Sequence, residues 1–179
     1  MVLHDLLAPR RDAVVGAWLT DMLATWPSPA STFVAAERDP FRNPIGRVMR
    51  EALDAAFVSL VSPAPLLALP PAFAELVALC AVQQDGAADF LDRVQGMAAI
   101  AGLVLESSAP PGERDAVMRT IEERVPALAQ LASAEHARCR ERIAAIRAHE
   151  AASRTWTAGG RRLHRPGAEA PGATSPSAK

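Results

Sequence analysis

The sequence has no tyrosine, and aromatic residues make up only 4% of the chain. Residues with a branched Cβ atom are also sparse, whereas 50% of the residues are hydrophobic and many of these are alanine. A sheet core is built from the bulky and β-branched side chains that are scarce here, while alanine has the highest intrinsic preference for helix. The composition therefore predicts an all-α protein.

Neither sign of charge is in excess, with 19 basic and 20 acidic residues and a net charge of −1. That balance gives no overall field to hold nucleic acid or an anionic membrane, so we expect no nucleic-acid partner. The two cysteines, Cys80 and Cys139, are too few for a disulfide framework or a structural zinc site. Reduced thiols in the cytoplasm are the simplest interpretation.

The sequence also has no long apolar run. Asp5, Arg10 and Arg11 place charges near the start, which is not typical of a signal peptide. Prolines or charges interrupt the longest apolar stretches well short of the ~20 residues that a membrane span needs. We therefore expect a cytoplasmic protein with no membrane span.

Apolar residues recur at three- and four-residue steps, which predicts five to six helices in a compact bundle, with a globin-like arrangement as an alternative. The first two segments are expected at residues 3–26 and from Pro44 to about 61, and the third opens at Pro70 and Pro71. The fourth carries the apolar residues from Phe90 to Val104, and the last is expected at 113–154, where Pro126 should kink or split it. We expect residues 1–157 to form one helical domain. Residues 158–179, rich in Gly, Pro, Ser and Arg, should form a disordered tail.

No nucleophile–base motif, phosphate-binding loop or H-E-x-x-H pattern is present, so we expect no enzyme and no cofactor. His136 and Cys139 lie three apart on the last segment, but two ligands fall short of a zinc site, and a packed pair is the plainer alternative. Arg138, Arg140 and Arg142 surround Cys139, and nearby cations can make a thiol reactive. Cys139 is therefore a candidate redox residue, although it shares the apolar face of its helix with Ile143 and Ile146.

The same segment carries interleaved charges, in which Glu150 can pair with Arg147 and Arg154. A solvated face is the ordinary interpretation. The sharper alternative is a surface that docks an acidic partner, with Arg140, Arg147 and Glu150 as its candidates.

The most informative local sequence is Asp39-Pro40-Phe41-Arg42-Asn43-Pro44-Ile45-Gly46. Asn43 before Pro44 predicts a helix start. The asparagine side chain accepts hydrogen bonds from the free N–H groups of the first turn, and proline at the first helical position sacrifices no hydrogen bond, because an N–H there would be unpaired. We expect a rigid corner in which Phe41 and Ile45 are buried. Gly46 would allow the backbone of another segment to approach closely. Arg42, Arg47 and Arg50 lie beside this corner and are candidates for a binding surface.

Four segments resemble a known family. Asp39 to Gly46 is similar to the D-x-F-x-N-P-V-G signature of the RsbRD N-terminal domain family. Cys139-Arg140-Glu141 and the residues up to Glu150 resemble its C-R-E-K-I-x-x-I-R-x-N-E segment. Thr25-Trp26-Pro27 and Ala81-Val82-Gln83 match a threonine–aromatic–proline end and an A-V-Q stretch in the same order. The resemblance covers about residues 3–154.

In that family the domain is a helical input module, often fused to a STAS domain in stressosome proteins. The resemblance thus implies a non-enzymatic regulatory or sensory module that acts through protein contacts, with STAS-domain stressosome proteins as partners. Stand-alone versions imply an alternative, an accessory or assembly protein for a sulfur-metabolism or respiratory complex, with redox-complex subunits as partners. A small-molecule or redox sensor using Cys139 is a further alternative, and a homodimer is also open. We expect no STAS domain after this module, and the stretch Ala132-Ser133-Ala134-Glu135-His136 departs from the family's pattern.

Overall fold

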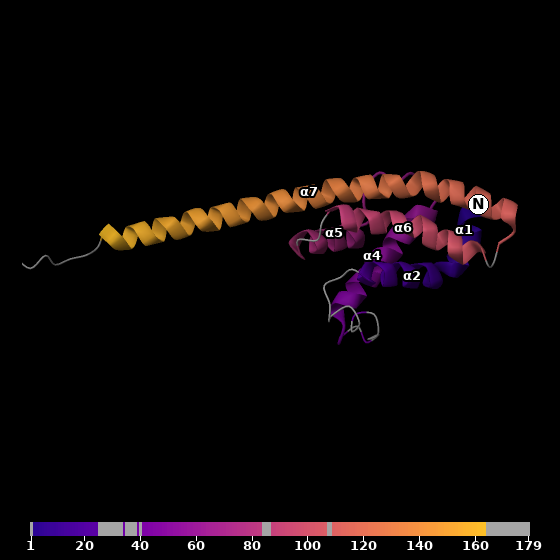
Figure 1. Cartoon of the computed structure of the whole chain (residues 1–179), viewed down its shortest axis with the longest axis horizontal. Helices are drawn as coiled ribbons and strands as arrows, with labels where there is room; N and C mark the ends of the chain where they lie inside the picture. Colours follow the sequence, from indigo (N-terminus) through magenta and orange to yellow (C-terminus); the bar gives the residue numbers. More distant parts are fainter. Residues whose placement is uncertain are drawn as a thin grey trace, which may run out of the picture. The chain divides into compact units, whose positions relative to one another are not determined.

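The computed structural model describes residues 2–24, 34, 39, 41–83, 87–106 and 109–163 of the 179-residue chain. No strand occurs among these residues. The helices, traced in chain order in Figure 1, are α1 (Val2–Leu7), the 3-10 turn η1 (Ala8–Arg10), α2 (Arg11–Ala24), α4 (Pro44–Val61), α5 (Pro71–Gln83), α6 (Ala87–Glu106) and α7 (Pro111–Leu163). The predicted all-α bundle is confirmed, while the globin-like arrangement stays a prediction.

The chain divides into two compact units, Met1–Glu141 and Arg142–Lys179. The first unit contains α1 to α6 and the N-terminal part of α7, and α2 contacts both α4 and α6 while α4 also contacts α5. In the second unit the structure describes residues 142–163, which are helical throughout.

A single apolar core holds the first unit together. Its members among the described residues are Val34 and residues of α1, α2, α4, α5, α6 and α7, the last of them being Ala132. A row of rings runs through it: Trp18 lies 6.2 Å from Phe73, Phe73 lies 6.4 Å from Phe90, and Phe90 stacks at 6.5 Å on His136. Such contacts add about 0.5–1.5 kcal/mol each beyond the burial of their surface. The row therefore ties α2, α5, α6 and α7 together.

Arginines from α6 and α7 bind the C-terminal ends of three earlier helices. Arg93 donates to the carbonyl of Met22 in α2 at 3.0 Å. Arg124 donates to Ser59 in α4 at 2.9 Å and to Ala64 just beyond it at 2.6 Å, and Arg140 donates to the carbonyl of Ala81 in α5 at 3.2 Å. The last four carbonyls of a helix have no partner within it, and a cation also suits the negative end of the helix dipole. These arginines thus supply donors to carbonyl groups at helix ends, and the same bonds join α6 and α7 to the earlier helices.

Two expected helix boundaries differ from the structure. The first segment is not one helix, because Pro9 has no N–H to donate and the chain passes through η1 between α1 and α2. The expected end of that segment at Trp26 lies outside the described residues, as does the proposed family match at Thr25 to Pro27. Pro44 and Pro71 begin α4 and α5, as predicted.

The last helix is longer than predicted and is not split at Pro126. It begins at Pro111 and continues to Leu163, beyond residue 158 where the tail was expected to begin. Extending an existing helix fixes only one residue for each new hydrogen bond. The end of α7 can therefore include weak helix formers such as Gly159 and Gly160. Residues 164–179 lie outside the described residues.

Three expected core positions are wrong. Phe41 is 95% exposed, Ile45 is 40% exposed and Ile146 is 59% exposed. Cys139 and Ile143 are half-buried. Ile45 lies in the first turn of α4, where Gly46 is buried but Pro44, Ile45 and Arg47 are exposed, and Ile146 lies in the second unit.

Candidate functional site

A chain of hydrogen bonds fixes the corner before α4. The carboxylate of Asp39 accepts from the N–H of Phe41 at 2.9 Å, and its carbonyl accepts from the N–H groups of Arg42 at 3.1 Å and Asn43 at 2.9 Å. An aspartate side chain that bonds two residues ahead forms a tight turn of its own. The side chain and the carbonyl of Asp39 therefore hold the corner together, and Pro40 lies outside the described residues.

Asn43 is the N-cap of α4 and is 2% exposed. Its Oδ1 accepts from the N–H of Gly46 at 2.8 Å, and its Nδ2 donates to the carbonyl of Val34 at 2.9 Å. The first bond satisfies one of the free N–H groups of the helix, as predicted. The second bond ties the corner to a residue nine positions earlier in the chain.

Gly46 is required for a reason other than the expected one. A Cβ atom on residue 46 would lie 2.7 Å from Cγ and 2.8 Å from Oδ1 of Asn43, which is too close. The group that approaches Gly46 is thus the capping side chain, not the backbone of another segment.

Phe41 projects from this fixed backbone into solvent. The other aromatic side chains that the structure describes, Trp18, Phe57, Phe73 and Phe90, are at most 3% exposed. Phe41 therefore differs from every aromatic residue in the described core. We call Phe41, Arg42, Ile45 and Arg47, all of them exposed, the corner surface.

The arginines of the corner have different surroundings. Arg47 forms an ion pair with Glu51 one turn later, at 3.6 Å, with both side chains more than half exposed. Arg42 is exposed, whereas Arg50 is half-buried and points away from the corner surface into a groove. Of the three arginines predicted here, two thus belong to the corner surface and one to the groove.

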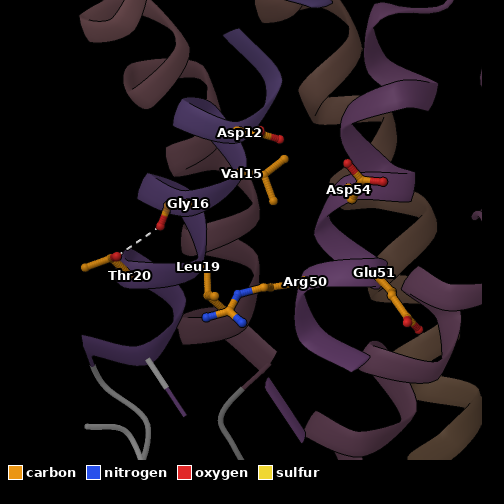
Figure 2. Close-up of a pocket in the computed structure, with 8 residues that line it drawn as sticks. All are labelled: Asp12, Val15, Gly16, Leu19, Thr20, Arg50, Glu51 and Asp54. Carbon is orange, nitrogen blue, oxygen red and sulfur yellow. Dashed lines mark hydrogen bonds between the residues drawn. The ribbon is translucent and has the colours of Figure 1, made fainter. Parts of the chain in front are cut away.

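The groove lies between α2 and α4 and has a volume of ≈ 720 Å³ (Figure 2). We call it the α2–α4 groove. Helix α4 contributes Arg50, Glu51 and Asp54 to its lining. Helix α2 contributes five residues, which are Asp12, Val15, Gly16, Leu19 and Thr20.

A bidentate ion pair between Arg11 and Asp54 joins the two helices at one end of the groove. The hydrogen bond to Asp54 is the largest of the causes that raise the pKa of Arg11, and the charges of Asp54 and Asp12 act in the same direction. Arg11 therefore stays protonated at every ordinary pH. Both side chains of the pair are partly exposed, so we expect its contribution to stability to be small.

The expected redox residue, Cys139, contacts a carboxylate. Its Sγ donates to Oε1 of Glu135 at 3.6 Å, and Glu135 pairs with Arg138 at 2.5 Å. Since an S–H donor is needed for this bond, the contact favours the protonated thiol. Neither Cys139 nor Cys80 forms a disulfide.

His136, three residues before Cys139, is 6% exposed and stacks on Phe90. The ring is therefore part of the core. Within the described ranges, no group of three or more His, Cys, Asp or Glu side chains could hold a metal ion.

The three charged candidates of the last helix fall into two units. Arg140 belongs to the first unit, where it binds the end of α5. Arg147 and Glu150 belong to the second unit and are exposed, and Glu150 pairs with Arg154 at 3.9 Å. Arg140 thus has a structural bond that the sequence did not reveal.

Sequence inspection missed the α2–α4 groove. Gly16, a glycine in the middle of a helix with no turn to explain it, was the one local signal. The pairing of Arg11 with Asp54 joins residues 43 positions apart, which no local pattern reveals.

No helix among the described residues combines the length and the apolar character that crossing a membrane requires. Comparisons with known proteins add no assignment, since the chain matches no family model, no curated protein and no solved structure.

Proposed function

We propose that this chain is a non-enzymatic regulatory or sensory module of the cytoplasm that acts through protein contacts, in the manner of RsbRD-type input domains. The observation that carries the proposal is the corner surface, where a backbone held by hydrogen bonds presents an exposed phenylalanine, Phe41, next to Arg42. Aromatic residues and arginine are the side chains most enriched where proteins bind one another.

The rigidity of the corner strengthens this argument. A backbone held in place before binding loses little conformational freedom when a partner arrives, so more of the contact energy appears as affinity. Asp39 fixes the backbone of Phe41 and Arg42, and Asn43 fixes the start of α4. An isolated exposed apolar residue needs no explanation, but an exposed aromatic residue on a fixed backbone, four residues before a second exposed apolar residue, Ile45, has the composition of a small binding patch.

A contact between two family-like segments also supports the proposal. Arg140, in the segment that resembles C-R-E, donates to the carbonyl of Ala81, in the segment that resembles A-V-Q. The two segments lie 59 positions apart in the chain. Two segments that make a structural contact with each other are expected to occur together in a family of such domains.

The test is a quantitative affinity purification of the tagged chain from its native cell, comparing three forms of the protein. These are the unaltered chain, Phe41→Ala, and the matched control Leu67→Ala. Leu67 is 82% exposed and lies in the connection between α4 and α5, away from the corner residues in sequence. Both substitutions remove an exposed apolar side chain, so neither should lower stability by more than about 0.5 kcal/mol.

We expect a protein partner that is recovered with the unaltered chain and with Leu67→Ala but is lost with Phe41→Ala. STAS-domain proteins or a switch kinase in that role would place the module in stress signalling. Redox-complex subunits would make it an accessory protein. Equal recovery of all proteins with Phe41→Ala would contradict the corner surface as the binding site.

A further inference from the structure

The two units of the chain carry net charges of opposite sign. Arg142–Lys179 contains seven basic and two acidic residues, which gives a net charge of +5. Met1–Glu141 contains the other 12 basic and 18 acidic residues, which gives −6. The expectation of no nucleic-acid partner rests on the balance over the whole chain, and that balance conceals this separation.

Most of the positive charge of the second unit lies on a helix. Residues 142–163 continue α7 (Figure 1), and we call them the basic arm. The arm has five arginines and one acidic residue, Glu150, which gives a net charge of +4. Because this count includes Glu150, which pairs with Arg154 at 3.9 Å, the positive charge does not depend on any single arginine being without a partner.

The described side chains of the arm are open to solvent. Every residue from Ala144 to Arg154 is exposed, as is Arg142. An exposed segment with an excess of one sign of charge attracts a partner of the opposite sign, and the attraction falls as salt screens it. The arm is therefore suited to a polyanion.

The arm has few of the side chains that anchor a protein interface. Ile143 is half-buried and Ile146 is 59% exposed, but from Arg147 to Arg154 there is no large apolar side chain. The centre of a protein interface is apolar or aromatic and is depleted of charged residues. Binding to a phosphate backbone needs no such anchor, because neutralised phosphates supply essentially all of the affinity of non-specific binding.

A membrane surface fits the arm less well than a nucleic acid does. Helices that lie on a membrane bury a face of large apolar residues opposite their basic face. On the face of the arm opposite Ile143 lie Ala145, Ala148 and Ala152, which have little apolar surface to bury.

The dimensions of the arm match those of duplex DNA. With a rise of 1.5 Å per residue, the arm is about 33 Å long, and an α-helix with its side chains is about 10–12 Å in diameter. The major groove of DNA is about 12 Å wide and admits such a helix, whereas that of double-stranded RNA is too narrow. DNA carries one negative charge for about every 1.7 Å of its axis, so phosphates lie along the whole length of the arm.

We propose that the basic arm binds duplex DNA without sequence preference, by lying along the major groove with its arginines on the phosphates. A guanidinium group presents a planar fork of N–H donors that matches two phosphate oxygens. This inference goes beyond the proposed function and does not depend on it, because the arm contains none of the residues of the corner surface.

Fluorescence anisotropy of a labelled duplex of mixed sequence, titrated with the purified full chain, tests the inference. We expect a Kd of about 10 μM or tighter at about 50 mM NaCl. About four neutralised phosphates give a slope of roughly −3.6 in a plot of log K against log salt, so raising NaCl to about 200 mM should weaken binding about 100-fold or more.

Paired substitutions test the location. Arg142→Gln with Arg147→Gln removes two exposed arginines of the arm, and it should raise the Kd about tenfold or more and reduce the salt slope by about 2. The matched control is Arg114→Gln with Arg119→Gln, which removes the same charge from the part of α7 in the first unit. The control should leave the Kd within about twofold, because salt screens charges far from the bound DNA. Circular dichroism of both variants checks that they are folded.

Two other polyanions test the class of partner. These are vesicles of equal parts phosphatidylserine and phosphatidylcholine, and poly-L-glutamate, each at the same concentration of negative charge as the DNA. We expect both to bind at least about tenfold more weakly than DNA, since neither presents a groove that receives a helix.

Three results would overturn the inference: no binding of DNA at the lower salt concentration, equal or tighter binding of the vesicles or of poly-L-glutamate, or equal weakening by the two pairs of substitutions. The salt series on the unaltered chain requires no variant. Recovery of a partner through Phe41 is independent of all three results, so the two proposals fail separately.

Discussion

Gly16 and Gly46 both lie in helices, yet their surroundings differ. We therefore expect substitution by alanine to have opposite effects on stability at the two positions. At Gly46 the new Cβ atom would displace the side chain of Asn43, which loses its bond to the first turn of α4 and its buried bond to Val34. Loss of an N-cap costs about 0.5–2 kcal/mol and a buried hydrogen bond about 1 kcal/mol, against about 1 kcal/mol gained from alanine. We expect Gly46→Ala to lower the free energy of unfolding by about 0.5–2 kcal/mol, measured by urea denaturation.

Gly16→Ala provides the contrast, because nothing lies within 4 Å of the added Cβ atom. We expect it to raise the free energy of unfolding by up to about 1 kcal/mol in the same urea experiment. A stabilising Gly46→Ala would show that Asn43 can move aside without cost. A destabilising Gly16→Ala would mean that the groove is narrower than the structure shows.

The role of a residue was predictable where it depends only on neighbouring residues in the sequence. The capping role of Asn43 follows from its own side chain and its neighbours in sequence, and the structure confirms it. The exposure of Phe41 does not follow in this way, since burial depends on whether a distant helix covers the position. The same limit applies to Ile45, which has the helical periodicity of a core residue but is 40% exposed in the first turn of α4.

At the scale of the elements, we expect the arginines at helix ends to be needed for stability. Arg93→Met keeps most of the aliphatic stem of the half-buried arginine but leaves the carbonyl of Met22 without this donor. A hydrogen bond from a charged donor contributes about 1.5–3 kcal/mol. We therefore expect Arg93→Met to lower the free energy of unfolding by about 1–3 kcal/mol. The thermal unfolding temperature should fall as well.

The matched control is Arg119→Met, which removes an exposed arginine of α7. It should change the free energy of unfolding by no more than about 0.5 kcal/mol. Equal effects of the two substitutions would indicate that removal of positive charge, and not the bond to the end of α2, is responsible.

Pro126 gives a second prediction for an element. Proline inside a helix lacks the N–H donor and is about 3 kcal/mol less favourable than alanine, yet α7 continues through Pro126, which is exposed. We expect Pro126→Ala to raise the free energy of unfolding by up to about 3 kcal/mol in urea denaturation. A loss of stability would show that the packing of α7 depends on the distortion that proline introduces.

The presence of each helix was predictable, because the apolar periodicity and the proline at the start of a helix are features of a short stretch of sequence. Their ends were harder to predict. The length of α7 depends on propagation from a helix already formed, and η1 depends on one missing N–H group at Pro9. The α2–α4 groove could not be predicted, because it exists only where two helices distant in sequence come together.

At the scale of the whole molecule, the first unit should be a self-sufficient folding unit. Every described member of the apolar core lies within Met1–Glu141, and so do the ring contact of His136 and the bond from Arg140 to Ala81. We expect the chain shortened to residues 1–141 to unfold cooperatively, with a free energy of unfolding within about 0.5 kcal/mol of the full chain. Urea denaturation followed by circular dichroism measures this.

A further shortening to residues 1–131 is the informative control. It removes the buried Ala132, the ring of His136 that stacks on Phe90, and the arginine that binds the end of α5. A stacked ring pair and a charged hydrogen bond together contribute about 2–4.5 kcal/mol, so this shorter chain should be less stable by at least about 2 kcal/mol. If residues 1–141 lost as much stability as residues 1–131, folding would depend on residues beyond Glu141, and the boundary between the two units would not be a boundary of stability.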